Sequence, residues 1–182
     1  FVLHKMLNVG IADAAQSVVD DFDDNGLDAI HYEATSKTLY LVQTKFRERE
    51  QFDEGDAIRF RSGADLLLGQ RYDRFNANVQ CRKDELDDAF DEAERIQLVV
   101  AYIGTGFSAH ANAALKELTE DEDHHEVGRL QPDIAEYGPD KVQADLLAEQ
   151  SVGVVNDSLV LSKWQHIGGH RDTHIGVALV SD

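Results

Sequence analysis

Residues 39–46 of the chain read Leu-Tyr-Leu-Val-Gln-Thr-Lys-Phe. Aliphatic, aromatic and β-branched residues make up most of this stretch, and such a composition is typical of a β-strand. Residues 28–33 have a similar character, and the short polar run at residues 34–37 separates the two stretches. The pattern therefore predicts a β-hairpin made of residues 28–33 and 38–46.

Three polar side chains of this hairpin are candidates for chemistry: Asp28, Gln43 and Lys45. Because side chains alternate across a strand, Gln43 and Lys45 project from the face that also carries Leu39 and Leu41. The opposite face carries Tyr40, Val42, Thr44 and Phe46. Asp28 lies about as far from the hairpin turn as Lys45 does, so strand pairing is expected to bring the three polar side chains together.

A carboxylate beside a Gln-x-Lys pair is suited to metal-dependent hydrolysis of phosphodiester bonds. Asp28 would be the anionic ligand of Mg²⁺ or Mn²⁺, and the Gln43 amide oxygen and the Thr44 carbonyl oxygen are further candidate ligands. Lys45 would orient or deprotonate the attacking water and offset charge on the phosphoryl oxygens. The alternative is that Lys45 is a solvated charge at a strand end and that the spacing arose by chance.

The run from Asp24 to Ile30 together with residues 39–46 resembles the PD-(D/E)xK restriction-endonuclease-like superfamily in its Q-x-K variant. Within it, the chain is most similar to the nuclease domain of the abortive phage infection (AIPR) proteins. The resemblance is close over residues 20–46, and beyond them, to about residue 180, it rests on the order of elements. It implies an α/β fold with a mixed β-sheet flanked by helices, Mg²⁺-dependent cleavage of DNA or RNA, and a role in phage resistance.

The chain departs from this family at one ligand position. Many members carry an additional acid on the first helix, whereas no Glu precedes Asp28 in this sequence. Asp13 or Asp24 is expected to replace it, unless the residue lies upstream of Phe1. A second hypothesis follows from this departure, in which the domain keeps the nuclease-like fold for binding nucleic acid or protein and is catalytically silent.

The net charge of −18 argues against a nucleic-acid partner, because phosphate binding depends on Lys and Arg. The charge is unevenly distributed, however. Residues 45–83 hold nine basic and seven acidic residues, a net charge of +2, and the rest of the chain carries −20. The candidate phosphate contacts in this region are Arg47, Arg49, Arg59 and Arg61. The alternative is a solvated helix face with i,i+4 ion pairs, such as one between Arg61 and Asp65.

The acidic residues also indicate an environment. Asp outnumbers Glu by 22 to 13 and Arg outnumbers Lys by 10 to 7. Such a strongly negative surface favours solubility at high salt, so we expect adaptation to a halophilic setting. In molar salt the screening length shrinks to about 3 Å, and net charge then says little about the substrate.

The whole chain is expected to form a single nuclease-like domain over residues 1–182. It begins at Phe1 inside an apolar helical segment, which suggests the N-terminal fragment of a longer protein. No secretory leader or long apolar run is visible, and the single cysteine, Cys81, fits a reducing cytoplasm. The expected partners are a nucleic-acid substrate and other domains of the same chain, with a homodimer as an open alternative and no membrane.

The remaining segments follow the same α/β plan. We expect a strand at residues 17–22, helices at 52–68 and 83–93, a buried strand at 96–103, and a turn at 104–106. Ser108 is expected to cap a helix that runs to about residue 118. Residues 120–126 are expected to form a solvated loop and residues 132–139 an irregular or short helical piece. Metal binding by His124 and His125 ranks low, and His166, His170 and His174 are expected in a loop between strands.

Overall fold

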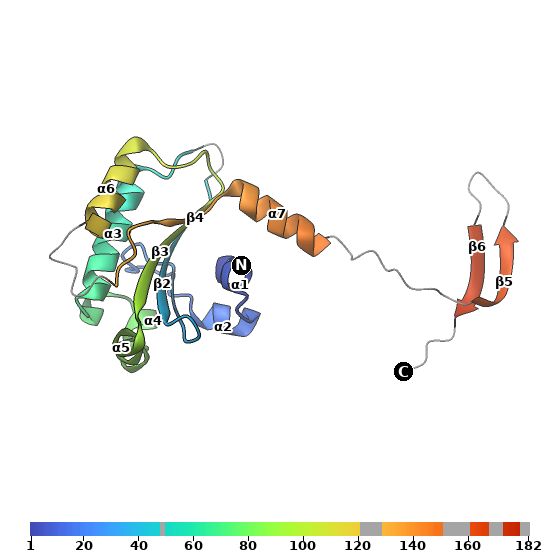
Figure 1. Ribbon diagram of the computed structural model, residues 1–182, viewed down its shortest axis with the longest axis horizontal. Helices are drawn as coiled ribbons and strands as arrows, with labels where there is room; N and C mark the ends of the chain where they lie inside the picture. The colour runs from blue at the N-terminus through green and yellow to red at the C-terminus, as the bar shows by residue number, and fades with distance from the viewer. Residues whose placement is uncertain (48–49, 121–128, 151–160, 168–172, 179–182) are drawn as a thin grey trace. The chain divides into compact units, whose positions relative to one another are not determined.

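A four-stranded mixed sheet forms the centre of the fold in the computed structural model, which describes residues 1–47, 50–120, 129–150, 161–167 and 173–178 (Figure 1). The strand order is β1-β2-β3-β4, with β1 antiparallel to β2 and the other pairs parallel. The strands span Ala29–Glu33 (β1), Thr38–Lys45 (β2), Arg95–Tyr102 (β3) and Ala135–Tyr137 (β4).

The hairpin predicted from residues 28–46 is present. Its register pairs Ala29 with Val42 and Glu33 with Thr38, so the four residues between Glu33 and Thr38 form the turn. The Glu33 carboxylate accepts a hydrogen bond from the Ser36 amide at 2.8 Å, and Lys37 adopts φ 49°. The turn is therefore stabilised by a side chain of the strand that enters it.

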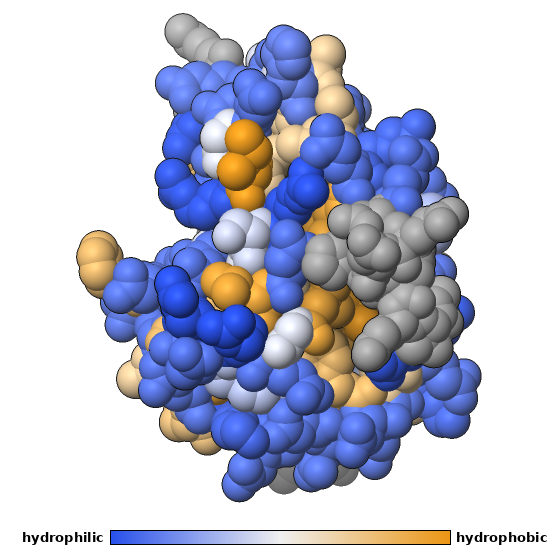
Figure 2. Space-filling model, turned by 90° about the vertical axis from the view of Figure 1, so that its left-hand side faces the viewer, coloured by the Kyte–Doolittle hydropathy of each residue, from blue (hydrophilic) through white to orange (hydrophobic). Residues whose placement is uncertain are grey.

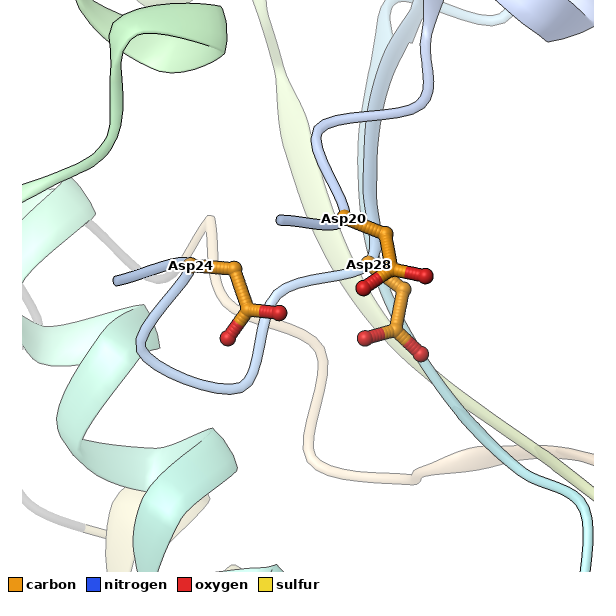
Figure 3. Close-up of side chains that lie close together, drawn as sticks. All are labelled: Asp20, Asp24 and Asp28. Carbon is orange, nitrogen blue, oxygen red and sulfur yellow. The ribbon is translucent and has the colours of Figure 1, made fainter. Parts of the chain in front are cut away.

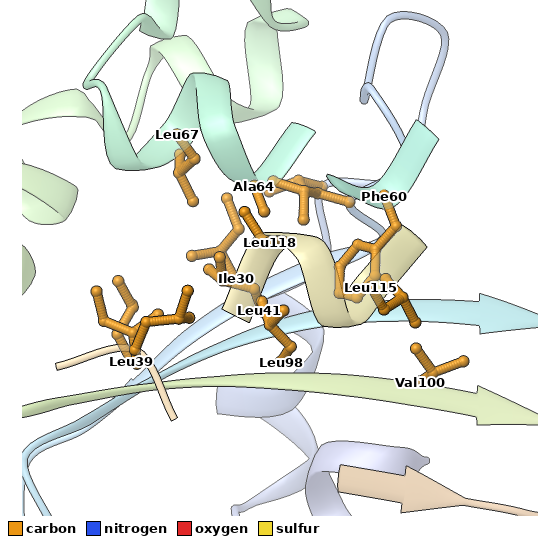
Figure 4. Packing of buried hydrophobic residues seen from close by; sticks show 14 of the residues in the cluster. Ile30, Leu39, Leu41, Phe60, Ala64, Leu67, Leu98, Val100, Leu115 and Leu118 are labelled. Carbon is orange, nitrogen blue, oxygen red and sulfur yellow. The ribbon is translucent and has the colours of Figure 1, made fainter. Parts of the chain in front are cut away.

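Helices cover both faces of the sheet. On one face Leu39 and Leu41 of β2 belong to a core that includes α3 (Glu54–Leu68) and α6 (Ala109–Glu120), and Figure 4 shows side chains of these helices meeting those of the strands. On the other face Val42 packs in a smaller cluster with α1 (Val2–Leu7) and α2 (Ile11–Gln16). The predicted mixed β-sheet flanked by helices is confirmed, and the alternation expected for residues 39–43 explains how β2 serves both cores.

Several predicted elements are confirmed, with small shifts at their ends. These are α3, α5 (Lys83–Glu92) and β3, together with the turn at residues 104–106 that leads into α6. Ser108 caps α6 as expected, because its hydroxyl oxygen accepts a hydrogen bond from the Ala111 amide at 3.0 Å. Short helices η1 (Tyr72–Arg74) and α4 (Ala77–Gln80) lie between α3 and α5.

Two local predictions are wrong. The strand expected at residues 17–22 is absent, because the chain leaves α2 and makes only one bridge, between Val18 and Ala29, before it turns. The segment at residues 132–139 contains a strand, β4, where an irregular or helical piece was expected. This three-residue strand forms because it pairs with the edge of β3, a long-range contact that leaves no local pattern. The helix α7 (Pro139–Gln150) follows it.

The chain divides into two compact units, residues 1–146 and residues 147–182. The second unit contains the antiparallel pair β5 (Leu161–Ile167) and β6 (Thr173–Ala178). A third local prediction is wrong here, because His166 and His174 lie in these strands as register partners and not in the loop between them. His170, His124, His125 and most of the acidic run at 120–126 lie outside the described residues. The single domain expected over residues 1–182 stays a prediction.

The surface is mainly polar. On the face shown in Figure 2, hydrophilic residues cover most of the area, and hydrophobic ones gather near its middle. Among the described helices, none combines the length and the apolar character needed to cross a lipid bilayer.

Candidate functional site

The three side chains that the sequence singled out line one open pocket of about 350 Å³. Gln43 and Lys45 lie at the C-terminal end of β2, and Asp28 is the residue directly before β1. The Asp28 amide donates to the Val42 carbonyl oxygen at 2.8 Å, which holds Asp28 beside Gln43. The expected convergence of Asp28, Gln43 and Lys45 is thus found in the structure.

The loop at residues 18–28 supplies the rest of the acidic wall of this pocket. The amides of Val19 and Asp20 both donate to the carbonyl oxygen of Asp28, at 2.9 and 3.2 Å. Asn76 holds the loop in place through two hydrogen bonds. Its side-chain nitrogen donates to the Val19 carbonyl oxygen at 2.8 Å, and its backbone N–H donates to the Asp23 carbonyl oxygen at 3.1 Å. These bonds place Asp20 next to Asp28 although eight residues separate them.

Gly26 allows the loop to pack directly against helix α3. Its φ is +82°, and a Cβ there would lie 3.0 Å from the backbone of Arg59 and Phe60 and 2.9 Å from the Gln43 side chain. The Gly26 amide donates to the Asp24 carboxylate at 2.6 Å. Glycine is required at this position because any other residue would be strained and would collide with the helix backbone.

Asp20, Asp24 and Asp28 form a cluster of carboxylates in which one oxygen of each lies within 4.8 Å of the others (Figure 3). Asp20 is exposed, and the other two are half-buried. Of the two acids expected to complete a ligand set, Asp24 is in this cluster and Asp13 is not, since Asp13 lies in the first turn of α2. Asp20 was missed by the sequence analysis.

Burial raises the pKa of the Asp28 carboxyl above its ordinary value, and the nearby charge of Asp20 raises it further. Hydrogen bonds from Thr44 act in the opposite direction, because its amide and its hydroxyl both donate to Asp28 Oδ2 at 2.5 Å. The raised pKa means that the folded protein disfavours the ionised form of Asp28, and a bound cation would offset this effect.

Gln43 is 1% exposed, and its amide has one orientation that satisfies its neighbours. In it the nitrogen donates to the Gly26 carbonyl oxygen at 2.5 Å and the oxygen accepts from Lys45 Nζ at 3.3 Å. In the opposite orientation the amide oxygen faces that carbonyl oxygen, and the nitrogen donates to the Asp28 carboxylate at 3.4 Å and to the Thr44 carbonyl oxygen at 3.3 Å. We adopt the first, which directs the amide oxygen into the site.

Lys45 has a second partner that the sequence analysis missed. Its Nζ lies 3.5 Å from Oδ1 of Asp56, a residue of α3 that is 3% exposed. Arg47 donates to the same carboxylate at 3.2 and 3.4 Å. A signal for Asp56 exists in the sequence, because it occupies the buried stripe of α3 that continues at Phe60, Ala64 and Leu67. A carboxylate on such a stripe needs a cationic or hydrogen-bonding partner.

The four candidate phosphate-binding arginines have different environments. Arg59 is exposed and lines the pocket, whereas Arg47 lines it but is held by Asp56. Arg61 pairs with Glu117 of α6, so its observed partner differs from the Asp65 considered above. Arg49 lies outside the described residues. Arg59 is therefore the candidate best placed to meet a ligand in this pocket.

The donors of the pocket fit a hard divalent cation. Carboxylate and amide oxygens are the ligands that Mg²⁺ and Mn²⁺ prefer, and Asp20, Asp24, Asp28 and Gln43 offer such oxygens on one side of the pocket. Lys45 lines the same pocket. Comparison of the chain with protein-family models, with curated proteins and with solved structures gives no match.

Proposed function

We propose that this chain carries a divalent-metal-dependent nuclease domain, a Q-x-K member of the PD-(D/E)xK superfamily that hydrolyses phosphodiester bonds. One observation carries the proposal: Asp28, Gln43 and Lys45 line one pocket at the end of β2. A carboxylate, a neutral oxygen donor and an ammonium group within one pocket are the groups that such hydrolysis needs.

Mg²⁺ or Mn²⁺ is the proposed cofactor, held by Asp28 and the Gln43 amide oxygen with Asp24 and Asp20 as the further acids. When bound, such an ion supplies Lewis-acid stabilisation of charge on the phosphoryl oxygens. The cluster of three carboxylates supports this assignment because it gathers oxygen donors in one pocket, and the burial that raises the pKa of Asp28 would be offset by a bound cation.

Lys45 is the proposed catalytic cation. Its ammonium group orients the attacking water and donates hydrogen bonds to phosphoryl oxygens as negative charge builds on them. The contacts to Gln43 and to the buried Asp56 hold the ammonium in the pocket that the acidic cluster lines. Arg59, on the same pocket, is the proposed contact to a flanking phosphate.

The experiment is a cleavage assay on plasmid, single-stranded DNA and RNA, with Mg²⁺, Mn²⁺ or a chelator. We expect the wild type to cut at least one substrate only with a divalent ion, and Lys45→Ala to lose about 10²-fold or more of that activity. Lys37→Ala is the matched control, because Lys37 lies at the opposite end of β2 and pairs with Glu94. Equal cleavage by the wild type and Lys45→Ala would contradict the proposal, and no cleavage by the wild type with any ion would favour a catalytically silent domain.

The biological role is a further part of the proposal. The resemblance of residues 20–46 to the AIPR nuclease domain supports a role in abortive infection, in the cytoplasm and within a longer chain. Cells expressing the full chain should resist phage, and Lys45→Ala should restore plaque formation to the level of cells without it. Unchanged resistance in that variant would show that cleavage at this site is not the cause.

A further inference from the structure

An apolar pocket of about 320 Å³ lies next to the acidic pocket. Its walls come from the ends of β2 and β3, from the start of the chain, and from α7. The side chains that make it apolar include Phe46, Ala101, Tyr102, Ile103, Val142 and Leu146. All of these residues belong to the first compact unit. The volume is near the lower end of the range for small-ligand sites, which suits one flat ring system.

The two pockets share a wall. Thr44, Lys45 and Phe46 line both, so the acidic cluster lies on one side of these residues and the apolar surface on the other. Phe46 is 82% exposed at the end of the strand that carries Lys45. What distinguishes Phe46 from an exposed aromatic residue such as Phe22 is that it lines both pockets, so its ring is available to a ligand there.

A ligand that fills both pockets needs an anionic part and a flat apolar part only a short distance apart. A nucleotide has this construction, with the phosphate for the side of Lys45 and the base for the side of Phe46. Bases stack on aromatic side chains in complexes with single strands, and every base offers a face for this contact. In a duplex both faces of an internal base are already stacked, so that base cannot enter a side pocket without being flipped out.

We propose that the apolar pocket takes an unpaired nucleobase stacked on Phe46, and that the substrate of this site is therefore single-stranded nucleic acid. The inference rests on the proposed nuclease function and adds the substrate class to it. An apolar segment of a protein partner is the competing occupant. The shared wall favours the nucleotide, because a purely apolar segment would place no anionic group beside Lys45.

The test is a binding measurement by fluorescence anisotropy in a chelator, with labelled oligonucleotides about 15 nucleotides long. Three probes of equal length are compared: a single strand, the same backbone with abasic sites in place of bases, and the blunt duplex. We expect the wild type to bind the single strand about 5- to 150-fold more tightly than the abasic probe, which is the range of one stacked base. It should also prefer the single strand to the duplex.

The Phe46→Ala variant should lose most of this preference while its affinity for the abasic probe stays unchanged. Phe46 is 82% exposed, so its removal is not expected to unfold the chain. Phe22→Ala is the matched control, because Phe22 is 85% exposed and lines neither pocket. An equal loss in both variants would overturn the inference, as would equal binding of the single strand and the abasic probe by the wild type.

The two proposals can fail separately. If the wild type cuts DNA or RNA but binds abasic and single-stranded probes equally, the base pocket is wrong and the nuclease assignment is retained. If it cuts nothing yet binds the single strand through Phe46, the base pocket is supported and the nuclease assignment fails.

Discussion

Lys45 Nζ lies 3.5 Å from Oδ1 of Asp56, and Asp56 is 3% exposed. The pair joins the end of β2 to the first turn of α3, where the Asp53 carboxylate caps the helix by accepting from the Asp56 amide at 2.9 Å. A buried carboxylate of this kind fixes the position of an ammonium group that would otherwise rotate freely on a flexible side chain. Asp56 is therefore a positioning residue for Lys45.

Asp56→Asn tests this relationship. We expect it to lower the free energy of unfolding by about 1–3 kcal/mol, because Lys45 and Arg47 lose a charged acceptor but stay partly solvated. If the protein cleaves nucleic acid, kcat should fall with little change in KM, since the ammonium is displaced from the reacting atoms. Asp73→Asn is the control, as this exposed residue pairs with Arg71 and its loss should change stability by less than about 0.5 kcal/mol. A change in stability with kcat intact would mean that Asp56 is only structural.

Gly26 and Gly106 offer a comparison between strain alone and strain with a steric clash. Both have positive φ, but a Cβ at Gly106 would meet nothing within 4 Å, whereas one at Gly26 would meet the backbone of α3. We expect Gly106→Ala to cost about 1–2 kcal/mol and Gly26→Ala about 2–4 kcal/mol in urea unfolding. Equal costs would mean that the loop at 18–28 is not packed tightly on the helix.

Features of the site that depend on contacts between neighbouring residues could be predicted from the sequence, whereas those that depend on contacts between distant segments could not. The hairpin and the common face of Gln43 and Lys45 follow from strand alternation and one short turn, which are local properties. Asp20 reaches Asp28 only because the amides of Val19 and Asp20 bond to the Asp28 carbonyl oxygen. Such a loop closure has no periodic pattern, and the apolar Val18 and Val19 suggested a strand in its place.

Asp56 and β4 are two further features that depend on long-range contacts. The helix at residues 52–68 was predicted, but the role of the acid on its buried face follows only from the contacts that Lys45 and Arg47 make with it. The strand β4 exists through its pairing with β3. Both depend on contacts between segments far apart in the chain, which the local pattern of a single sequence does not reveal.

Arg59 and Arg61 lie two residues apart on α3 but have different surroundings, so one can contact a ligand phosphate and the other forms an ion pair within the protein. Arg59 lines the pocket, and Arg61 is engaged with Glu117. We expect Arg59→Ala to weaken binding of single-stranded oligonucleotides and to lower the slope of log K against log salt concentration by about 1. Arg61→Ala should leave that slope unchanged. The same slope in both variants would exclude Arg59 as a phosphate contact.

His31 gives the stability a pH dependence below neutrality. Burial lowers the pKa of its imidazole, and the charge of Arg82 lowers it further, while Ser17 Oγ lies 2.9 Å from Nδ1. The unfolded chain therefore takes up the proton first, so stability is fully present above the ordinary pKa of 6.5 and is lost as the pH falls through the lower folded value.

The urea midpoint should thus fall from about pH 7.5 to about pH 5.5 by more in the wild type than in His31→Asn, which cannot titrate. His110→Asn, at an exposed position of α6, should behave as the wild type does. The comparison among the three proteins isolates the contribution of His31. An identical decline in the wild type and His31→Asn would contradict the prediction.

Binding of Mn²⁺ at Asp28, followed by isothermal titration calorimetry, tests the central claim most directly, because the proposed chemistry depends on a cation beside Lys45. We expect saturable binding to the wild type, binding at least about tenfold weaker to Asp28→Asn, and unchanged binding to the exposed control Asp73→Asn. No saturable binding to the wild type, or equal affinity in the wild type and Asp28→Asn, would contradict the account.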